Sequence, residues 1–180
     1  MHGLILVELK KFVRTNFGDV AWTDMLRAAG LESKVYLATD TCPDAEVVAL
    51  VTAASRQLGK PAPAILESFG EFLVPDLVRL YAAIIHPTWR TLDLLANTET
   101  VMHKAVRAQS PGATPPNLIC QRPGPGEVVI IYSSPRKMCA LARGLVKGIA
   151  KHFDERIVLK DQSCMITGDP DCRLSVRLAG

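Results

Sequence analysis

Apolar positions recur at helical spacing through the first two thirds of the chain, where charged residues fill the remaining positions. Stop signals for helices, above all glycine and proline, separate the periodic stretches. Four helices are predicted in this part of the chain. The opening helix has Leu4, Val7, Phe12 and Val13 on its apolar face, and the second runs from Asp44 or Ala45 to the Gly-Lys-Pro sequence at 59–61. The third spans residues 62–85, where Pro75 can bend it, and the fourth spans residues 89–108.

The pattern changes at residues 110–116, where Ser-Pro-Gly-Ala-Thr-Pro-Pro predicts a stiff connection rich in turns. The predicted elements beyond it are strands at 118–121 and 128–132, a helix at 137–153, and strands at 156–159, 163–167 and 172–178, the last two joined by a turn at 168–171. Helices first, and strands on both sides of one helix afterwards, predict one α+β domain with an antiparallel sheet. Its helical part spans about 1–109 and its α/β part about 117–180.

Composition and charge exclude several classes of protein. Apolar residues make up 48% and charged residues 22% of the 180 residues, as in an ordinary soluble domain. The formal charge of +3 is too small to favour nucleic acid or a membrane surface as a partner. Glu8 and Lys10 interrupt the apolar start, and no stretch of about 18 uncharged apolar residues follows. We expect a cytoplasmic protein with neither partner.

Tyr132, Ser134 and Arg136 carry the first candidate chemistry. They alternate where a predicted strand ends, so their side chains leave from one face. A phenol, a hydroxyl and a guanidinium in a row suit carboxylates, because Arg binds them bidentately and the other two add directional hydrogen bonds. The simpler interpretation is an ordinary polar strand end.

His103 lies on the predicted helix 89–108 between the apolar residues Met102 and Val106. A neutral imidazole is the commonest axial ligand of haem in sensors and globins, but a lone histidine on an apolar helix is more often a packed core residue. Pro115 and Pro116 follow, and they form either a rigid wall or a stiff linker.

Taken together, these features resemble the haem–nitric oxide/oxygen binding (H-NOX) family, which is related to the haem domain of soluble guanylate cyclase. The resemblance rests on His103, on the Gly-Ala-Thr-Pro-Pro sequence at 112–116 and on the Tyr-x-Ser-x-Arg motif at 132–136. The opening Met-His-Gly-Leu-Ile and the closing strands also fit, so it covers essentially the whole chain.

The resemblance implies a haem b between the helical part and the sheet. His103 would be the proximal ligand of its iron, and Tyr132, Ser134 and Arg136 would hold its propionates. Pro116 would press on the porphyrin and distort it. The apolar residues that would line the pocket are Ile5, Leu141 and Leu145.

The resemblance also bears on the gas. Oxygen-binding members carry a distal tyrosine five residues beyond the arginine of the motif, where this chain has Leu141. The positions that would support such a tyrosine hold Leu9 and Leu73. Bound O2 needs a hydrogen-bond donor more than NO or CO does, which predicts a sensor of NO and CO that excludes O2. NO would weaken the bond between iron and His103 and release strain. A separate effector, such as a histidine kinase or a cyclic-di-GMP enzyme, would read the change.

Cys139, Cys164 and Cys172 lie in the second half of the chain and can meet there. Some H-NOX members resemble this pattern and complete a zinc site with a histidine, where this chain has Asp161. Zinc and buried free thiols both remain open, since five cysteines in a reducing compartment do not indicate disulfides.

A different class of function is a non-haem module, either a zinc/thiol redox regulator or a small-molecule-binding domain. The colour of the purified protein separates it from a haem sensor. No nucleophile–histidine–acid order, phosphate-binding glycine loop or paired carboxylates stand out, so we expect no enzyme.

Overall fold

The computed structural model describes residues 1–110 and 112–179. Pro111, which belongs to the predicted connection, and Gly180 lie outside the described part. The fold is α+β, as predicted. Its helices are α1 (Gly3–Phe17), α2 (Asp19–Ala28), α3 (Asp44–Leu58), α4 (Ala62–Leu80), the short 3-10 helix η1 (Ala82–Ile84), α5 (Thr91–Asn97), the π-helical turn η2 (Thr98–His103), α6 (Lys104–Gln109) and α7 (Cys139–His152). Its strands are β1 (Asn117–Gly124), β2 (Glu127–Ser133), β3 (Ile157–Ser163) and β4 (Cys172–Leu178).

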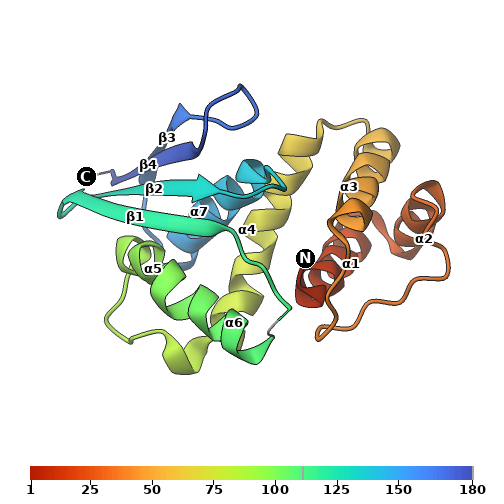
Figure 1. Ribbon diagram of the computed structural model, residues 1–180, viewed down its shortest axis with the longest axis horizontal. Coiled ribbons are helices and arrows are strands. Elements are labelled where there is room, and N and C mark those ends of the chain that lie inside the picture. Colours follow the sequence, from red (N-terminus) through yellow and green to blue (C-terminus); the bar gives the residue numbers. More distant parts are fainter. Residues whose placement is uncertain (111, 180) are drawn as a thin grey trace.

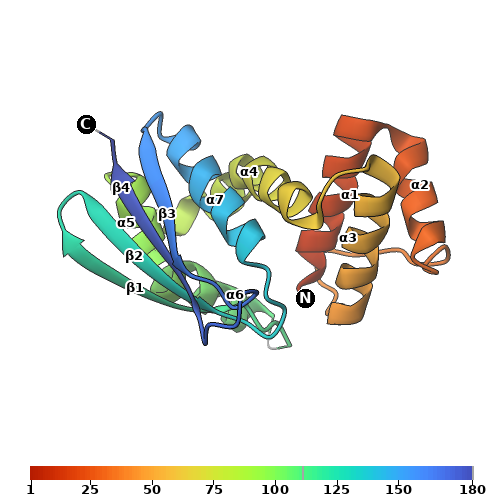
Figure 2. The same cartoon turned by 90° about the horizontal axis from the view of Figure 1, so that it is seen from above.

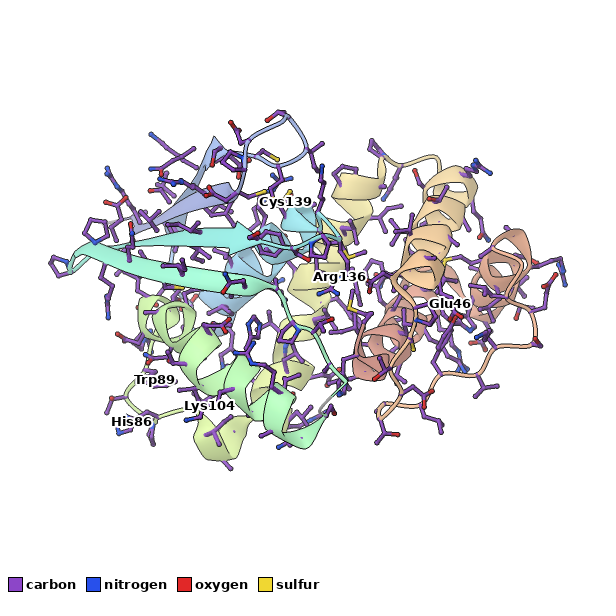
Figure 3. All side chains as sticks on the ribbon, in the orientation of Figure 1. Glu46, His86, Trp89, Lys104, Arg136 and Cys139 are labelled. Atoms are coloured by element: carbon purple, nitrogen blue, oxygen red, sulfur yellow. The ribbon has the colours of Figure 1, made fainter. Side chains whose placement is uncertain are left out.

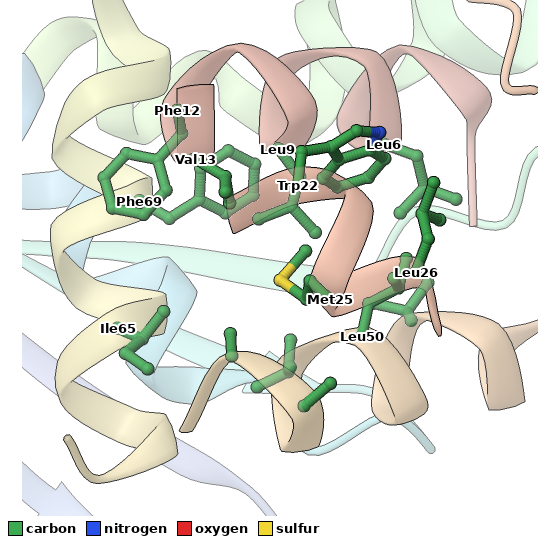
Figure 4. Packing of buried hydrophobic residues seen from close by; sticks show 14 of the residues in the cluster. Leu6, Leu9, Phe12, Val13, Trp22, Met25, Leu26, Leu50, Ile65 and Phe69 are labelled. Carbon is green, nitrogen blue, oxygen red and sulfur yellow. The ribbon is translucent and has the colours of Figure 1, made fainter. Parts of the chain in front are cut away.

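Helices α1, α2 and α3 form one end of the molecule and the sheet forms the other, with α4 between them (Figures 1 and 2). The helical end has its own apolar core, because each helix turns its periodic apolar face inward. Phe12 from α1, Met25 from α2, Leu50 from α3 and Phe69 from α4 meet there, and each is at most 5% exposed (Figure 4).

The sheet has the strand order β1-β2-β4-β3, and every neighbouring pair in the described residues is antiparallel. Val128 and Ile130 of β2 and Leu174 and Val176 of β4 pack on one face with residues of α5 and α7. This face carries a second core, and the sheet thereby holds α7 and the segment with His103 on the same side.

The structure differs from the predicted elements in three main places. The predicted strand 163–167 is wrong: β3 runs through Ser163, and a turn follows, in which the Asp169 carboxylate accepts the backbone N–H of Cys164 at 2.7 Å. The single helix predicted for 89–108 is divided into α5, η2 and α6. Helix α2 was not predicted, although Trp22 and Met25 supply its buried face. None of the helices in the described residues is long and apolar enough to cross a membrane.

Helices α4 and α7 approach each other closely at glycine residues. A Cβ built on Gly144 would lie 2.0 Å from the carbonyl oxygen of Glu67, and one on Gly70 would lie 2.5 Å from the carbonyl oxygen of Leu141. Real atoms do not come so near, so a side chain at either position would force the two backbones apart.

Gly144→Ala is therefore expected to destabilise the fold by about 3 kcal/mol, at the upper end of the usual cost of overpacking. Gly126→Ala is the matched control, because a Cβ there meets nothing within 4 Å and the residue is exposed. Urea unfolding of both variants measures the difference. Equal midpoints would contradict the close packing of α4 on α7.

Candidate functional site

A cavity of about 250 Å³ lies between the helical end and the sheet. Its wall is mostly apolar and takes residues from α1, α4, the segment α5–η2–α6, β1, β2 and α7. The structure brings most of the predicted site residues together on this wall: Ile5, His103, Pro116, Tyr132, Arg136, Leu141 and Leu145. Residues up to 140 positions apart in the sequence thus line one cavity.

His103 is the last residue of η2, and its side chain is 15% exposed. Its Nδ1 lies 2.8 Å from Oε2 of Glu99, so Nδ1 donates to the carboxylate and Nε2 keeps its lone pair. Burial lowers the pKa of His103, against the opposing effect of Glu99. The ring is therefore neutral at pH 7, which is the state in which a histidine binds a metal.

Arg136 is a cation buried at the rim of the cavity, with a side chain only 6% exposed. Its Nη1 lies 3.3 Å from both carboxylate oxygens of Asp44 on α3. Its backbone N–H donates to Ser134 Oγ at 3.3 Å. In Figure 3, Arg136 lies where the sheet meets the N-terminal helices. A buried guanidinium of this kind is suited to an anionic group that enters the rim.

Tyr132 and Ser134 complete the predicted motif. Both are buried, at 4% and 2% exposure. Burial raises the pKa of Tyr132, so its phenol keeps the proton and acts as a donor. Tyr132 lines the cavity, whereas Ser134 contacts Arg136 from behind the wall.

The apolar side of the cavity is formed by Ile5 from α1 and by Leu141 and Leu145 from α7. Leu9 and Leu73 lie deeper, in the helical core. Besides Tyr132, three residues with hydroxyl groups also line the wall: Thr114 of the predicted connection, and Thr98 and Tyr81, which the sequence analysis did not identify. Thr98 donates its hydroxyl to the Leu94 carbonyl at 2.9 Å. Tyr81 follows α4 and is half-buried, which raises its pKa.

The sulfurs of Cys139, Cys164 and Cys172 lie within 4.8 Å of one another. The two closest distances are 3.7 Å between Cys139 and Cys164 and 4.0 Å between Cys172 and Cys164. All three are free thiols, and burial together with the neighbouring sulfurs raises the pKa of Cys139 to about 12. Figure 3 shows Cys139 beside the turn between β3 and β4.

The structure does not bring Asp161 into this cluster. Its carboxylate pairs with Arg143 of α7 at 2.9 Å, and Arg143 also pairs with Glu67 of α4. A carboxylate engaged by a guanidinium is a poor candidate for a metal ligand. The prediction of Asp161 as the fourth ligand therefore has no geometric support.

The sequence analysis missed two residues that contact predicted site residues directly. Glu99 lies four residues before His103, a spacing that places both on one side of a helix, so the pair was visible in the sequence. Asp44 is 92 residues from Arg136, and no local pattern connects them.

Comparisons with known proteins agree with this geometry. A family model described as Haem-NO-binding matches residues 2–161. Soluble guanylate cyclase gcy-32 of Caenorhabditis elegans is 26% identical over 170 residues, which is 88% of this chain and 24% of that protein. The chain thus spans about a quarter of that relative's length.

Solved structures show the same fold. An H-NOX protein from S. oneidensis in the Fe(II)NO state has a TM-score of 0.93 and 26% identity, with 100% of both chains covered. The Fe(II) unliganded H-NOX protein from K. algicida has a TM-score of 0.91 at 21% identity, with 100% of this chain and 97% of that chain covered, and supports the fold alone. The chain belongs to the haem-NO-binding (H-NOX) family, a family of haem-based gas sensors.

Proposed function

We propose that this chain senses NO and CO with a haem b held by His103, excludes O2, and signals to a separate effector. The observation that carries the proposal is the buried, neutral imidazole of His103, which lines a cavity whose wall is otherwise mostly apolar. A histidine kinase or a cyclic-di-GMP enzyme is the effector that the resemblance favours.

The residues of the cavity fit a haem. Nδ1 of His103 is bonded to Glu99, so Nε2 would be the atom that ligates iron. Arg136 and Tyr132 offer a cation and a hydroxyl for the propionates, and Ser134 orients the backbone of Arg136. Pro116 lies on the same wall as His103, in a place to press on the macrocycle. When bound, haem would supply an iron to which a diatomic gas can bind.

The selectivity for NO and CO follows from the wall that Ile5, Leu141 and Leu145 form. Their side chains carry no hydrogen-bond donor, so bound O2, which carries partial negative charge, gains nothing from them. NO and CO depend far less on such a donor. Tyr81 is a side chain on the cavity wall whose hydroxyl can be tested as a donor to the bound gas.

The signal would leave through polar contacts that join the helical end to the rest of the molecule. His2 Nε2 lies 2.8 Å from Ser110 Oγ, directly after α6, and Arg136 holds Asp44 of α3. A shift of His103 on η2 would move α6 and strain the contacts of His2 with Ser110 and of Arg136 with Asp44. The helical end then moves against the sheet, which is a two-state element biased by the gas.

Exposure of the ferrous protein to air tests the selectivity. The expected result is slow oxidation without a stable dioxygen complex, while CO gives a stable complex under the same conditions. A persistent dioxygen spectrum in aerobic buffer would refute the exclusion of O2. Tyr81→Phe then decides whether Tyr81 is the missing donor, because the variant keeps the ring and removes only the hydroxyl.

A second proposal concerns the thiols: Cys139, Cys164 and Cys172 bind zinc. Their sulfurs are close enough to share one ion, and the backbone N–H of Met165 donates to Cys172 Sγ at 3.2 Å, as amide groups do around metal thiolates. Zinc would make this part of the domain sensitive to thiol oxidation, since oxidised sulfur releases the metal.

Protein purified without chelator or oxidant is expected to contain about one zinc ion per chain. Cys164→Ser should lower that content severalfold because it removes one thiolate of the cluster. Cys120→Ser is the control, since Cys120 lies away from the cluster and donates to the Leu95 carbonyl. Less than about a tenth of an equivalent of zinc in the unchanged protein would contradict the site.

A further inference from the structure

The proximal histidine has a carboxylate partner on its own helical turn. Glu99 Oε2 accepts the Nδ1–H of His103 at 2.8 Å, and the side chains are 24% and 15% exposed. Both lie in η2, so the pair is built into one short segment. We propose that Glu99 is a positioning residue that makes His103 a stronger donor to the haem iron and thereby limits how readily NO breaks the iron–His103 bond. The inference rests on the proposed ligation of haem by His103.

The surroundings of the carboxylate support this role. Glu99 Oε2 accepts from Nδ1 of His103, and Oε1 pairs with the Arg107 guanidinium. Two donors therefore face the carboxylate, which fixes Glu99 as the acceptor and His103 as the donor of the pair.

An acceptor with a full charge polarises the imidazole more than a carbonyl or a water does. Electron density moves from Nδ1 towards Nε2, and the basicity of Nε2 as a metal ligand rises. A more basic Nε2 strengthens the bond to iron and stabilises the ferric state, because hydrogen bonding behind the axial ligand tunes haem iron. NO would weaken this bond, so the strength that Glu99 adds would oppose the release of His103.

Arg107 moderates the effect from the other side of the carboxylate. It pairs with Oε1 of Glu99, whereas His103 contacts Oε2. Arg107 lies on α6, and its side chain is 45% exposed. Its positive charge draws electron density away from the carboxylate. Removal of that charge should leave Glu99 a stronger acceptor for His103.

The two partners therefore give a test in which a merely structural role and an electronic role predict different results. Glu99→Gln keeps the shape and an acceptor oxygen but removes the charge. Arg107→Gln keeps the Glu99 carboxylate and removes the guanidinium that competes with His103 for it. Loss of an ordinary helix contact would affect the iron in the same direction in both variants, whereas the electronic role predicts opposite directions.

The measurements are made on haem-loaded protein: the iron–histidine stretching frequency of the ferrous form under argon, the reduction potential, and the ratio of five- to six-coordinate NO complex. In Glu99→Gln the frequency should fall, the potential should rise and the ratio should increase about tenfold, the lower end for loss of a partner behind a metal ligand. In Arg107→Gln the frequency should rise and the ratio should decrease.

An unchanged frequency and potential in folded Glu99→Gln would overturn the inference. If that variant does not fold, a fall or no change of the frequency in Arg107→Gln would overturn it. Failure of the proposed function looks different. In that case the unchanged protein shows no iron–histidine stretch, or the stretch survives replacement of His103.

Discussion

Replacement of His103 by glycine is expected to empty the cavity of haem, or to make haem retention depend on added imidazole. Among the described residues that line the cavity, the other imidazole is that of His2, which is hydrogen-bonded to Ser110 and to the backbone N–H of Leu4. Both ring nitrogens of His2 are therefore engaged, and the described residues of the cavity wall offer no further imidazole. The ratio of haem to protein should fall by at least about tenfold without imidazole and recover when imidazole fills the space.

His86→Gly is the matched control for this variant. His86 lies on an exposed turn, where its Nδ1 bonds to Thr88, and it does not line the cavity. Its haem content should equal that of the unchanged protein. Equal haem content and equal iron coordination in His103→Gly would show that another residue is the ligand.

Leu141→Tyr is expected to create affinity for O2. Leu141 lines the cavity from α7, and a phenol there would bring a donor into a wall that has none in Ile5 or Leu145. A hydrogen bond to a partly charged acceptor contributes about 1.5–3 kcal/mol, which corresponds to an increase in O2 affinity of roughly 10–100-fold. Absorption spectra over a range of O2 pressures measure the change.

Leu141→Phe separates the hydroxyl from the bulk of the ring. It should leave O2 binding undetectable, because the ring alone donates nothing to the bound gas. CO affinity should change by a similar factor in both variants, since CO depends little on a donor. If the tyrosine variant binds O2 no better than the phenylalanine variant, the apolar wall is not the cause of the selectivity.

The sequence predicted the parts of this molecule that depend on local periodicity. Helices α3 and α4 and strand β2 lie where the apolar pattern placed them, apart from a few residues at the ends. Helix α2 was missed because it is only ten residues long, and the partners of Trp22 and Met25 are distant in sequence. The predicted strand 163–167 failed because Asp169 fixes a turn there through its side chain.

The site residues divide in the same way, into those that the sequence pattern predicted and those that only the fold brings together. His103, Pro116, Tyr132 and Arg136 were found because their spacing resembles that of a family, not because any of them is distinctive alone. The carboxylate on Arg136 comes from Asp44 on another helix, and only the fold brings it there. Asp161 was predicted as a metal ligand from its position, but Arg143 competes for its carboxylate. Such long-range competition between partners has no signature in a single sequence.

One absorption experiment tests the central claim most directly. The reduced protein is measured under argon and again after addition of NO. The proposed function predicts a red protein with the spectrum of five-coordinate ferrous haem, converted by NO to a nitrosyl spectrum that includes a five-coordinate fraction. A colourless protein, or a haem spectrum that NO leaves unchanged, would contradict the proposal that His103 holds the iron of a nitric oxide sensor.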